Sequence, residues 1–316
     1  MGKFKIFLLS VTPLIIILAI GCFIWFNHES IKIKAITKNL KVIDMNEDHN
    51  QALDVIDYAK SKNIEIPKTI INFDTHSDMF ITKEIHPKYG ADIYEWLNEY
   101  FAKNPNAEEL YYIMPIEEAR SKKMQQAFIE KDVADMVALY GNSIKDEKNI
   151  NPHVDKIPFI QYFVIDTNNG YMTEYIEEKD KSRLNNPRYK KIKIITCTEK
   201  TLPDFKNKNV VLSIDFDYIS NSGFDTIENF KNNKTPLEIK LAISKMLSTM
   251  KKKNIRPEII SLTLSPFYVP DEDIDQIYNF MEDFIKYSGQ KDALKKYTYK
   301  CEKPRKTLKE ERYEGF

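Results

Sequence analysis

Residues 68–78 read KTIINFDTHSD. A short run rich in β-branched residues, typical of a buried strand, passes directly into three potential metal ligands, Asp74, His76 and Asp78. If the backbone stays extended, residues two apart project to the same side, so these three side chains can converge on one point. In open α/β sheets, ligands bind beyond the carboxyl ends of the strands, and this stretch therefore predicts a binding site at such an end.

A second stretch has the same design. Residues 209–217 read NVVLSIDFD, so an apolar run again ends in acids, here Asp215 and Asp217, and a further potential ligand, His49, lies earlier in the sequence EDHN. Each signal alone has another reading. An Asp-x-Asp after a strand also opens haloacid-dehalogenase phosphatases and marks metal sites in glycosyltransferases, the Asp-x-His-x-Asp stretch also fits a solvated turn, and His49 also fits a helix start. Together the six residues predict one shared site.

Electrostatics predicts what this site contains. Four carboxylates within metal-binding distance of one another repel by about 4 kcal/mol per close pair at intermediate dielectric. Two divalent cations carry four positive charges, which balance the four aspartates, and the two histidines serve as neutral ligands. Carboxylate and imidazole ligands without thiolate favour Mn²⁺, with Fe²⁺, Co²⁺ or Zn²⁺ as alternatives. Two such ions about 3.5–4 Å apart can share and deprotonate one water, which supplies a nucleophile near neutral pH.

The order and rough spacing of these motifs resemble the ureohydrolase (arginase/agmatinase) and histone-deacetylase superfamily. The similarity is closer to a divergent ureohydrolase-like family that includes peptide arginases, and it extends over residues 41–287. It rests on the sequences EDHNQAL (47–53), NFDTHSDM (72–79), ELYYIMP (109–115) and SLTLSP (261–266). The resemblance implies a three-layer arginase/deacetylase-like α/β fold with a central, mostly parallel sheet.

The resemblance also implies a role for each ligand. The first ion would be held by His49, Asp74, Asp78 and Asp215. The second ion would be held by Asp74, His76, Asp215 and Asp217, so that two aspartates are shared. Asp78 and His86 are the candidate catalytic residues, because a proton-shuttling histidine follows the Asp-x-His-x-Asp motif in arginases. An ordinary loop histidine is the alternative reading of His86.

One departure from the family bears on the substrate. Arginases place a glutamate near the end of a late strand, where it receives the guanidinium, and the matching position here is Thr263. The resemblance therefore points to peptidyl arginine, or a related guanidino or amide substrate, and away from free arginine. We expect a hydrolase of C–N bonds that acts on a peptide or small molecule. The alternatives are a metal-dependent deacetylase of the same superfamily, a type II membrane glycosyltransferase that uses Asp215 and Asp217, and a non-catalytic metal-binding module.

The N-terminus differs in character from the rest of the chain. Residues 6–26 are almost unbroken apolar sequence after Lys3 and Lys5, which is long enough to span a bilayer. We expect residues 1–28 to be a transmembrane anchor, because a cleaved signal peptide has a shorter apolar core. Lipidation at Cys22 is the alternative. Lysines flank both sides of the apolar stretch, and we expect a single-pass membrane protein with its catalytic domain outside the cytoplasm.

Composition sets the remaining limits. The 316 residues suffice for one large α/β domain, and 47 basic against 47 acidic side chains leave no net charge to favour nucleic acid. The three cysteines lack paired spacing, so neither a zinc motif nor a disulfide framework is indicated. We expect a connector over residues 29–39, the metallohydrolase domain over 40–288 with an insert-rich part at 120–190, and a polar tail over 289–316.

Hydrophobic periodicity predicts alternating strands and helices. Strands are expected over residues 40–43, 68–73, 110–114, 159–165, 192–197, 209–214 and 259–264. Helices are expected over residues 50–62, 91–102, 236–252 and 271–287. Such alternation predicts a parallel sheet with helices on both faces.

Overall fold

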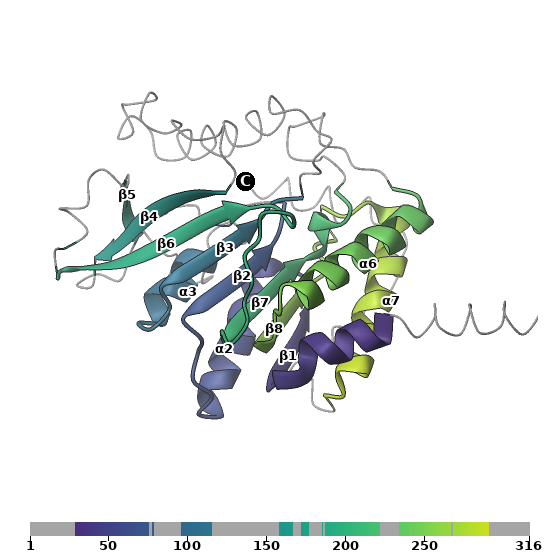
Figure 1. Ribbon diagram of the computed structural model, residues 1–316, viewed down its shortest axis with the longest axis horizontal. Helices are drawn as coiled ribbons and strands as arrows, with labels where there is room; N and C mark the ends of the chain where they lie inside the picture. Colours follow the sequence, from purple (N-terminus) through teal and green to yellow (C-terminus); the bar gives the residue numbers. More distant parts are fainter. Residues whose placement is uncertain are drawn as a thin grey trace, which may run out of the picture.

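An eight-stranded sheet organises the domain, in the order β1-β8-β7-β2-β3-β6-β4-β5 (Figure 1). The computed structural model describes residues 29–75, 78, 96–115, 158–166, 172–176, 185, 187–221, 234–266 and 268–290. Its strands are β1 (Val42–Asn46), β2 (Thr69–Phe73), β3 (Glu109–Ile113), β4 (Phe159–Asp166), β5 (Met172–Ile176), β6 (Tyr189–Cys197), β7 (Val210–Asp215) and β8 (Pro257–Thr263). In the order of the sheet, every neighbouring pair in β1-β8-β7-β2-β3-β6 is parallel. Strand β4 runs antiparallel to both of its neighbours, β6 and β5.

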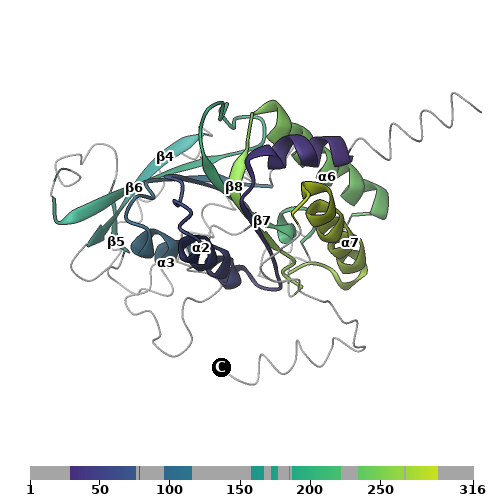
Figure 2. The ribbon, with the colours of Figure 1, turned by 90° about the horizontal axis from the view of Figure 1, so that it is seen from below.

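Helices cover both faces of this sheet. They are α2 (Ala52–Ser61), α3 (Trp96–Lys103), α6 (Pro236–Lys252) and α7 (Asp271–Ser288), with short 3₁₀ helices η1 (Thr37–Asn39), η2 (His49–Gln51) and η6 (Phe216–Tyr218). The pair α2 and α3 packs on one side, and α6 and α7 pack on the other (Figure 2). The fold is therefore α/β with three layers and a mostly parallel sheet, as predicted.

The central strands are apolar on both faces, and this explains the two helical layers. In β2, Ile71 and Phe73 belong to the core beneath α6 and α7, whereas Ile70 belongs to the core beneath α2 and α3. In β7, Leu212 likewise belongs to the core beneath α6 and α7, and Val211 belongs to the core beneath α2 and α3. Alternation along each strand thus distributes its apolar side chains between two separate cores.

The predicted elements have counterparts in the described residues, with ends shifted by a few positions. Helix α6 spans the expected residues, and it begins there because Thr235 forms a capping box with Glu238 and Pro236 occupies the first turn. Strand β5 was not expected, because it lies in the segment that we expected to be insert-rich, 120–190. The reversed direction of β4 was not expected either, since hydrophobic periodicity carries no information on strand direction.

Residues 29–36 are helical, and η1 continues them. Ile33 and Ile36, three positions apart on one face, are buried in the core with α6 and α7. Lys32 Nζ donates to the carbonyl and the hydroxyl of Ser244 on α6, at 3.0 and 2.9 Å. The segment that we expected to be a connector therefore contributes to the core of the domain.

Several expectations fall on other parts of the chain. The expected anchor, residues 1–28, lies outside the described residues, as does most of the expected tail. Across the ranges that the structure describes, no helix combines the length and the apolar character needed to cross a bilayer.

Truncating Ile36 tests whether residues 29–39 belong to the folded domain. Ile36 is fully buried, whereas Ile31 on the same helix is 54% exposed. We expect Ile36→Ala to lower the free energy of unfolding by about 2–5 kcal/mol, because it leaves a cavity in the core. The matched variant Ile31→Ala should change it by less than about 0.5 kcal/mol. Urea unfolding measures both, and a small effect of both substitutions would contradict this packing.

Candidate metal centre

The carboxyl ends of four parallel strands, β1, β8, β7 and β2, lie next to one another at one edge of the sheet. Asp74 directly follows β2, Asp215 ends β7, and Asp217 lies in η6 just beyond it. Asn72 and Ser213 pair in register, so the next residues on the same strand face, Asp74 and Asp215, also come together. His49 reaches the same point from η2, shortly after β1.

His49 lies at the centre of three carboxylates. Its Nδ1 is 2.6 Å from Asp78 Oδ2, 3.0 Å from Asp74 Oδ2 and 3.3 Å from Asp215 Oδ2. All four residues are buried. One ring nitrogen carries at most one proton and cannot donate to three carboxylates together. Two donor atoms that each bind one ion at about 2.1 Å lie about 3.0–3.4 Å apart, which suits the separations to Asp74 and Asp215, whereas the approach of Asp78 is that of a charge-assisted hydrogen bond.

Two overlapping groups of donors can be distinguished. His49, Asp74 and Asp78 form one, and Asp74, Asp215 and Asp217 form the other, with the donor atoms inside each group within 4.8 Å of one another. Asp74 belongs to both groups, as the resemblance implies for two ions, whereas Asp215, the second aspartate expected to be shared, belongs to one group only. His76 and His86 lie outside the described residues. The buried histidine and aspartates can therefore form a metal site, and their donor types suit a divalent cation.

The pKa values reflect this concentration of charge. Burial raises the pKa of the Asp215 carboxyl well above its ordinary value, and repulsion from Asp217 and Asp74 acts in the same direction. Burial on its own lowers the pKa of His49, but the nearby Asp78 and Asp74 outweigh it, and the pKa ends well above the ordinary value. Without a cation, the site therefore retains protons, and metal binding must release them.

Two polar residues inside apolar strands support the ligands. Asn72 Nδ2 donates to Asp74 Oδ2 at 3.0 Å, and Ser213 Oγ lies 2.8 Å from His49 Nε2. A proton on Nε2 that is donated to Ser213 leaves Nδ1 with the lone pair that a metal requires. Asn72 and Ser213 each precede an aspartate of the site, Asp74 or Asp215, by two positions. Our sequence analysis missed both residues, although this spacing is the signal that could have revealed them.

Two further supporting residues come from distant parts of the chain. Trp96 Nε1 donates to Asp78 Oδ2 at 2.6 Å, and its ring lies 4.8 Å from that of His49. Ser265 Oγ donates to Asp215 Oδ2 at 2.6 Å. Asp78 and Ser265 both adopt left-handed backbone conformations, with φ of 51° and 48°. Such strain in non-glycine residues clusters at functional sites. No local pattern marks Trp96 as a site residue, because only tertiary contacts bring it there.

Asp217 is held in place by the loop after β2. Thr75 N donates to Asp217 Oδ1 at 3.1 Å, and Thr75 Oγ1 donates to the Asp217 carbonyl at 3.0 Å. Asp217 N in turn donates to Asp215 Oδ1 at 3.0 Å, and the Tyr112 hydroxyl donates to the Thr75 carbonyl at 2.9 Å. These bonds tie η6 to the loop that begins with Asp74.

Comparison with known proteins adds no family assignment. Neither a scan against protein-family models nor a search of the curated proteins finds a match for this chain. The interpretation of the site therefore depends on its own geometry and on the resemblance of its motifs.

Removing the Ser213 hydroxyl tests the support of His49. We expect Ser213→Ala to weaken Mn²⁺ binding by about 10–100-fold, because the imidazole loses the partner that orients it. The matched control is Ser261→Ala. Ser261 is also buried and pairs in register with Ser213, but its hydroxyl accepts from Asn46 Nδ2 at 2.8 Å. Isothermal titration calorimetry measures both variants, and an equal loss in the two would refute this role of Ser213.

Stabilisation by Mn²⁺ should depend on pH. The protons that His49 and Asp215 retain through their raised pKa values stabilise the metal-free fold at low pH, and this contribution is lost as pH rises through those values. Metal binding needs the same groups without protons. We therefore expect the rise in Tm caused by Mn²⁺ to increase as the pH is raised above the ordinary histidine pKa of about 6.5. A rise that is constant, or larger in acid, would contradict this competition.

Proposed function

We propose that this protein is a dinuclear metal-dependent hydrolase of C–N bonds with an arginase/deacetylase-like fold. The observation that carries the proposal is the approach of three buried aspartates to one nitrogen of His49, at the carboxyl edge of a parallel sheet. Such an edge is where open α/β sheets bind their ligands. The order of the motifs along the chain, which resembles that of ureohydrolases, supports the same conclusion.

The proposed metal is a pair of Mn²⁺ ions, with Fe²⁺, Co²⁺ or Zn²⁺ as alternatives. The ligands would be His49, Asp74, His76, Asp78, Asp215 and Asp217. When bound, the ions would supply Lewis acidity and an activated water. Trp96 and Ser265 would keep the carboxylates of Asp78 and Asp215 oriented through the hydrogen bonds that they donate. Asp78 and His86 are the residues that we propose to accept and return protons during the reaction.

Thr263 bears on the choice of substrate. It is buried at the end of β8, in register with Asp215 on one side and Asn46 on the other. The family resemblance places a guanidinium-binding glutamate at this position, and a threonine hydroxyl offers no charge to pair with a guanidinium. The threonine thus speaks against free arginine as arginases bind it, and the resemblance to peptide arginases leads us to propose peptidyl arginine, or a related guanidino or amide group, as the substrate. Hydrolysis of an arginyl side chain consumes one water and yields an ornithine residue and urea.

The same threonine favours one alternative. An acetylated amine is neutral at the reacting amide and needs no carboxylate partner, so a metal-dependent deacetylase of this superfamily is the second candidate. The glycosyltransferase alternative is weaker. It assigns a role to Asp215 and Asp217 only, and none to His49, whose Nδ1 lies within 3.3 Å of three aspartates.

We also propose that residues 1–28 anchor the protein in a membrane as a single-pass segment, with the catalytic domain outside the cytoplasm. The apolar stretch over residues 6–26 supports this proposal. Protection of the catalytic domain from added protease in sealed membrane vesicles would directly test on which side of the membrane this domain lies.

Release of urea from an arginyl peptide in the presence of Mn²⁺ tests the proposed activity. We expect Asp74→Asn to lower the rate by more than about 100-fold, because it removes the carboxylate that both donor groups share. The control is Asp57→Asn on α2, which should leave the rate unchanged because the Asp57 side chain is 61% exposed.

Other outcomes would replace the proposal. Acetate release from acetylated amines, without urea release, would move the enzyme to the deacetylase class. Dependence on a nucleotide sugar would identify a glycosyltransferase. Metal binding without any of these activities would favour a non-catalytic module.

A further inference from the structure

Three exposed apolar side chains lie on two adjacent helices. Ile31, on the helix over residues 29–36, and Leu237 and Leu241, one turn apart on α6, are each 54–57% exposed. Among the described residues, the one other large apolar side chain with such exposure is Ile160 on β4, far from α6 at the other end of the sheet (Figure 1). We call Ile31, Leu237 and Leu241 the apolar patch.

The two helices that carry the apolar patch pack side by side and run in the same direction. Lys32 Nζ donates to Ser244 on α6. Further along both helices, Arg256 Nη1, just beyond α6, donates to the Ala35 carbonyl. The amino end of the helix over residues 29–36 is therefore directed toward the amino-terminal half of α6, where the two leucines of the patch lie.

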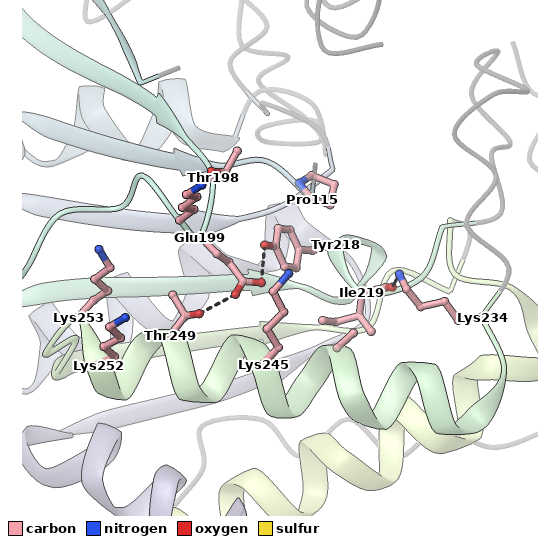
Figure 3. Close-up of a pocket in the computed structure, with 12 residues that line it drawn as sticks. Pro115, Thr198, Glu199, Tyr218, Ile219, Lys234, Lys245, Thr249, Lys252 and Lys253 are labelled. Carbon is pink, nitrogen blue, oxygen red and sulfur yellow. Dashed lines mark hydrogen bonds between the residues drawn. The ribbon is translucent and has the colours of Figure 1, made fainter. Parts of the chain in front are cut away.

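Contacts inside the domain use the two flanks of α6 and leave the leucines between them. On one flank, Ser244 holds the helix over residues 29–36. On the other flank, Thr249 Oγ1 donates to Glu199 Oε2 at 2.6 Å, and the loop after β6 lies against the helix (Figure 3). At about 100° per residue, the two leucines fall between Ser244 and Thr249 around the helix axis. Burial of the leucines therefore requires something outside the described domain.

The sequence before residue 29 indicates what covers the apolar patch. Residues 6–26 form the apolar stretch that is long enough to span a bilayer, and only residues 27 and 28 separate it from the helix that carries Ile31. An extended chain covers at most about 3.6 Å per residue, so the step from residue 26 to residue 29 spans at most about 11 Å. With residues 6–26 across a bilayer, this helix begins in the headgroup region or next to it.

We propose that the apolar patch lies on the lipid surface beside the anchor and holds the domain against the membrane in one orientation. The proposal rests on the membrane anchor proposed above and is independent of the hydrolase chemistry. Apolar side chains on a helix that lies in the interface bury into the boundary between headgroups and acyl chains. The anchor keeps the patch at the membrane, so the contact needs little affinity of its own.

Charges around the apolar patch suit anionic lipid. Lys34 and Lys38 are exposed and follow Ile31 by three and seven positions, on the same side of the chain. Anionic headgroups attract such lysines. The amino-terminal half of α6 has one acidic residue, Glu238, whose carboxylate accepts from Thr235 N and Oγ1 at 2.8 Å. In a symmetric dimer through the patch, the lysines of the two copies would instead be brought toward one another, which favours lipid over a second copy.

Fluorescence quenching by lipid in the full-length protein tests the proposal. Cys22→Ser and Cys301→Ser leave Cys197, which is buried, as the remaining native cysteine. A single new cysteine in this background then carries a nitrobenzoxadiazole label. Each labelled protein is reconstituted into vesicles of phosphatidylglycerol and phosphatidylcholine, with bromine atoms on the acyl chains of the phosphatidylcholine. Bromine quenches the label only where the two come close together.

We expect the label at Leu237→Cys and at Leu241→Cys to be quenched at least about threefold more than the label at Ile160→Cys. Ile160→Cys is the matched control, because it replaces an exposed apolar side chain at the other end of the sheet. All three positions are exposed, so the three variants should keep the Tm of the parent protein.

Extraction with alkaline carbonate separates failure of this proposal from failure of the anchor. A protein that resists extraction, but whose label is quenched equally at all three positions, would keep the anchor and overturn the contact of the patch with lipid. A blue shift of the label on α6 without quenching would also overturn it, since a protein surface such as a second copy would then cover the patch. Removal of the protein by carbonate would overturn both the anchor and this proposal.

Discussion

Mutual repulsion among buried carboxylates is the constraint on which the proposed chemistry depends. Asp74, Asp78, Asp215 and Asp217 have little contact with solvent, and three of them face the same nitrogen of His49. Charges removed from water in this way are unfavourable unless protons or cations neutralise them. The raised pKa values of His49 and Asp215 reflect burial and the concentration of negative charge around them. Divalent ions provide the alternative that leaves the carboxylates ionised.

The rest of the fold holds these charges together against their repulsion. Parallel strands with apolar residues on both faces form two cores, and both cores fix the strand ends from which the ligands project. Trp96, Ser213 and Ser265 add hydrogen bonds that orient individual ligands. Asp78 and Ser265 adopt left-handed backbone conformations, which are unfavourable for non-glycine residues and which the surrounding structure maintains. Rigid strands and a hydrogen-bonded outer layer are the usual supports of an accurately placed metal site.

Local sequence patterns predicted the parts of the structure that depend on local chemistry. Strands β2 and β7 were recognised from apolar runs, and the aspartates that follow them were recognised because ligands gather at strand ends. Ile33 and Ile36 show the limit of this approach. Their spacing fits a buried helical face, but the surrounding lysines led us to expect a connector. The spacing was visible in the sequence, but the burial of these two side chains depends on packing against α6, which lies far away in the chain.

Features created by distant contacts could not be predicted in this way. Trp96 meets Asp78, and Ser265 meets Asp215, only after the chain has folded. His76 and His86 were predicted from sequence alone and lie outside the described residues, so they stay predictions.

Anomalous diffraction at the manganese absorption edge, from crystals grown with Mn²⁺, tests the central claim most directly. We predict two peaks about 3.5–4 Å apart. One should lie within bonding distance of His49 Nδ1, and Asp74 should contact both. The absence of any peak bonded to His49 and Asp74, with the metal bound elsewhere or not at all, would contradict the proposed metal centre.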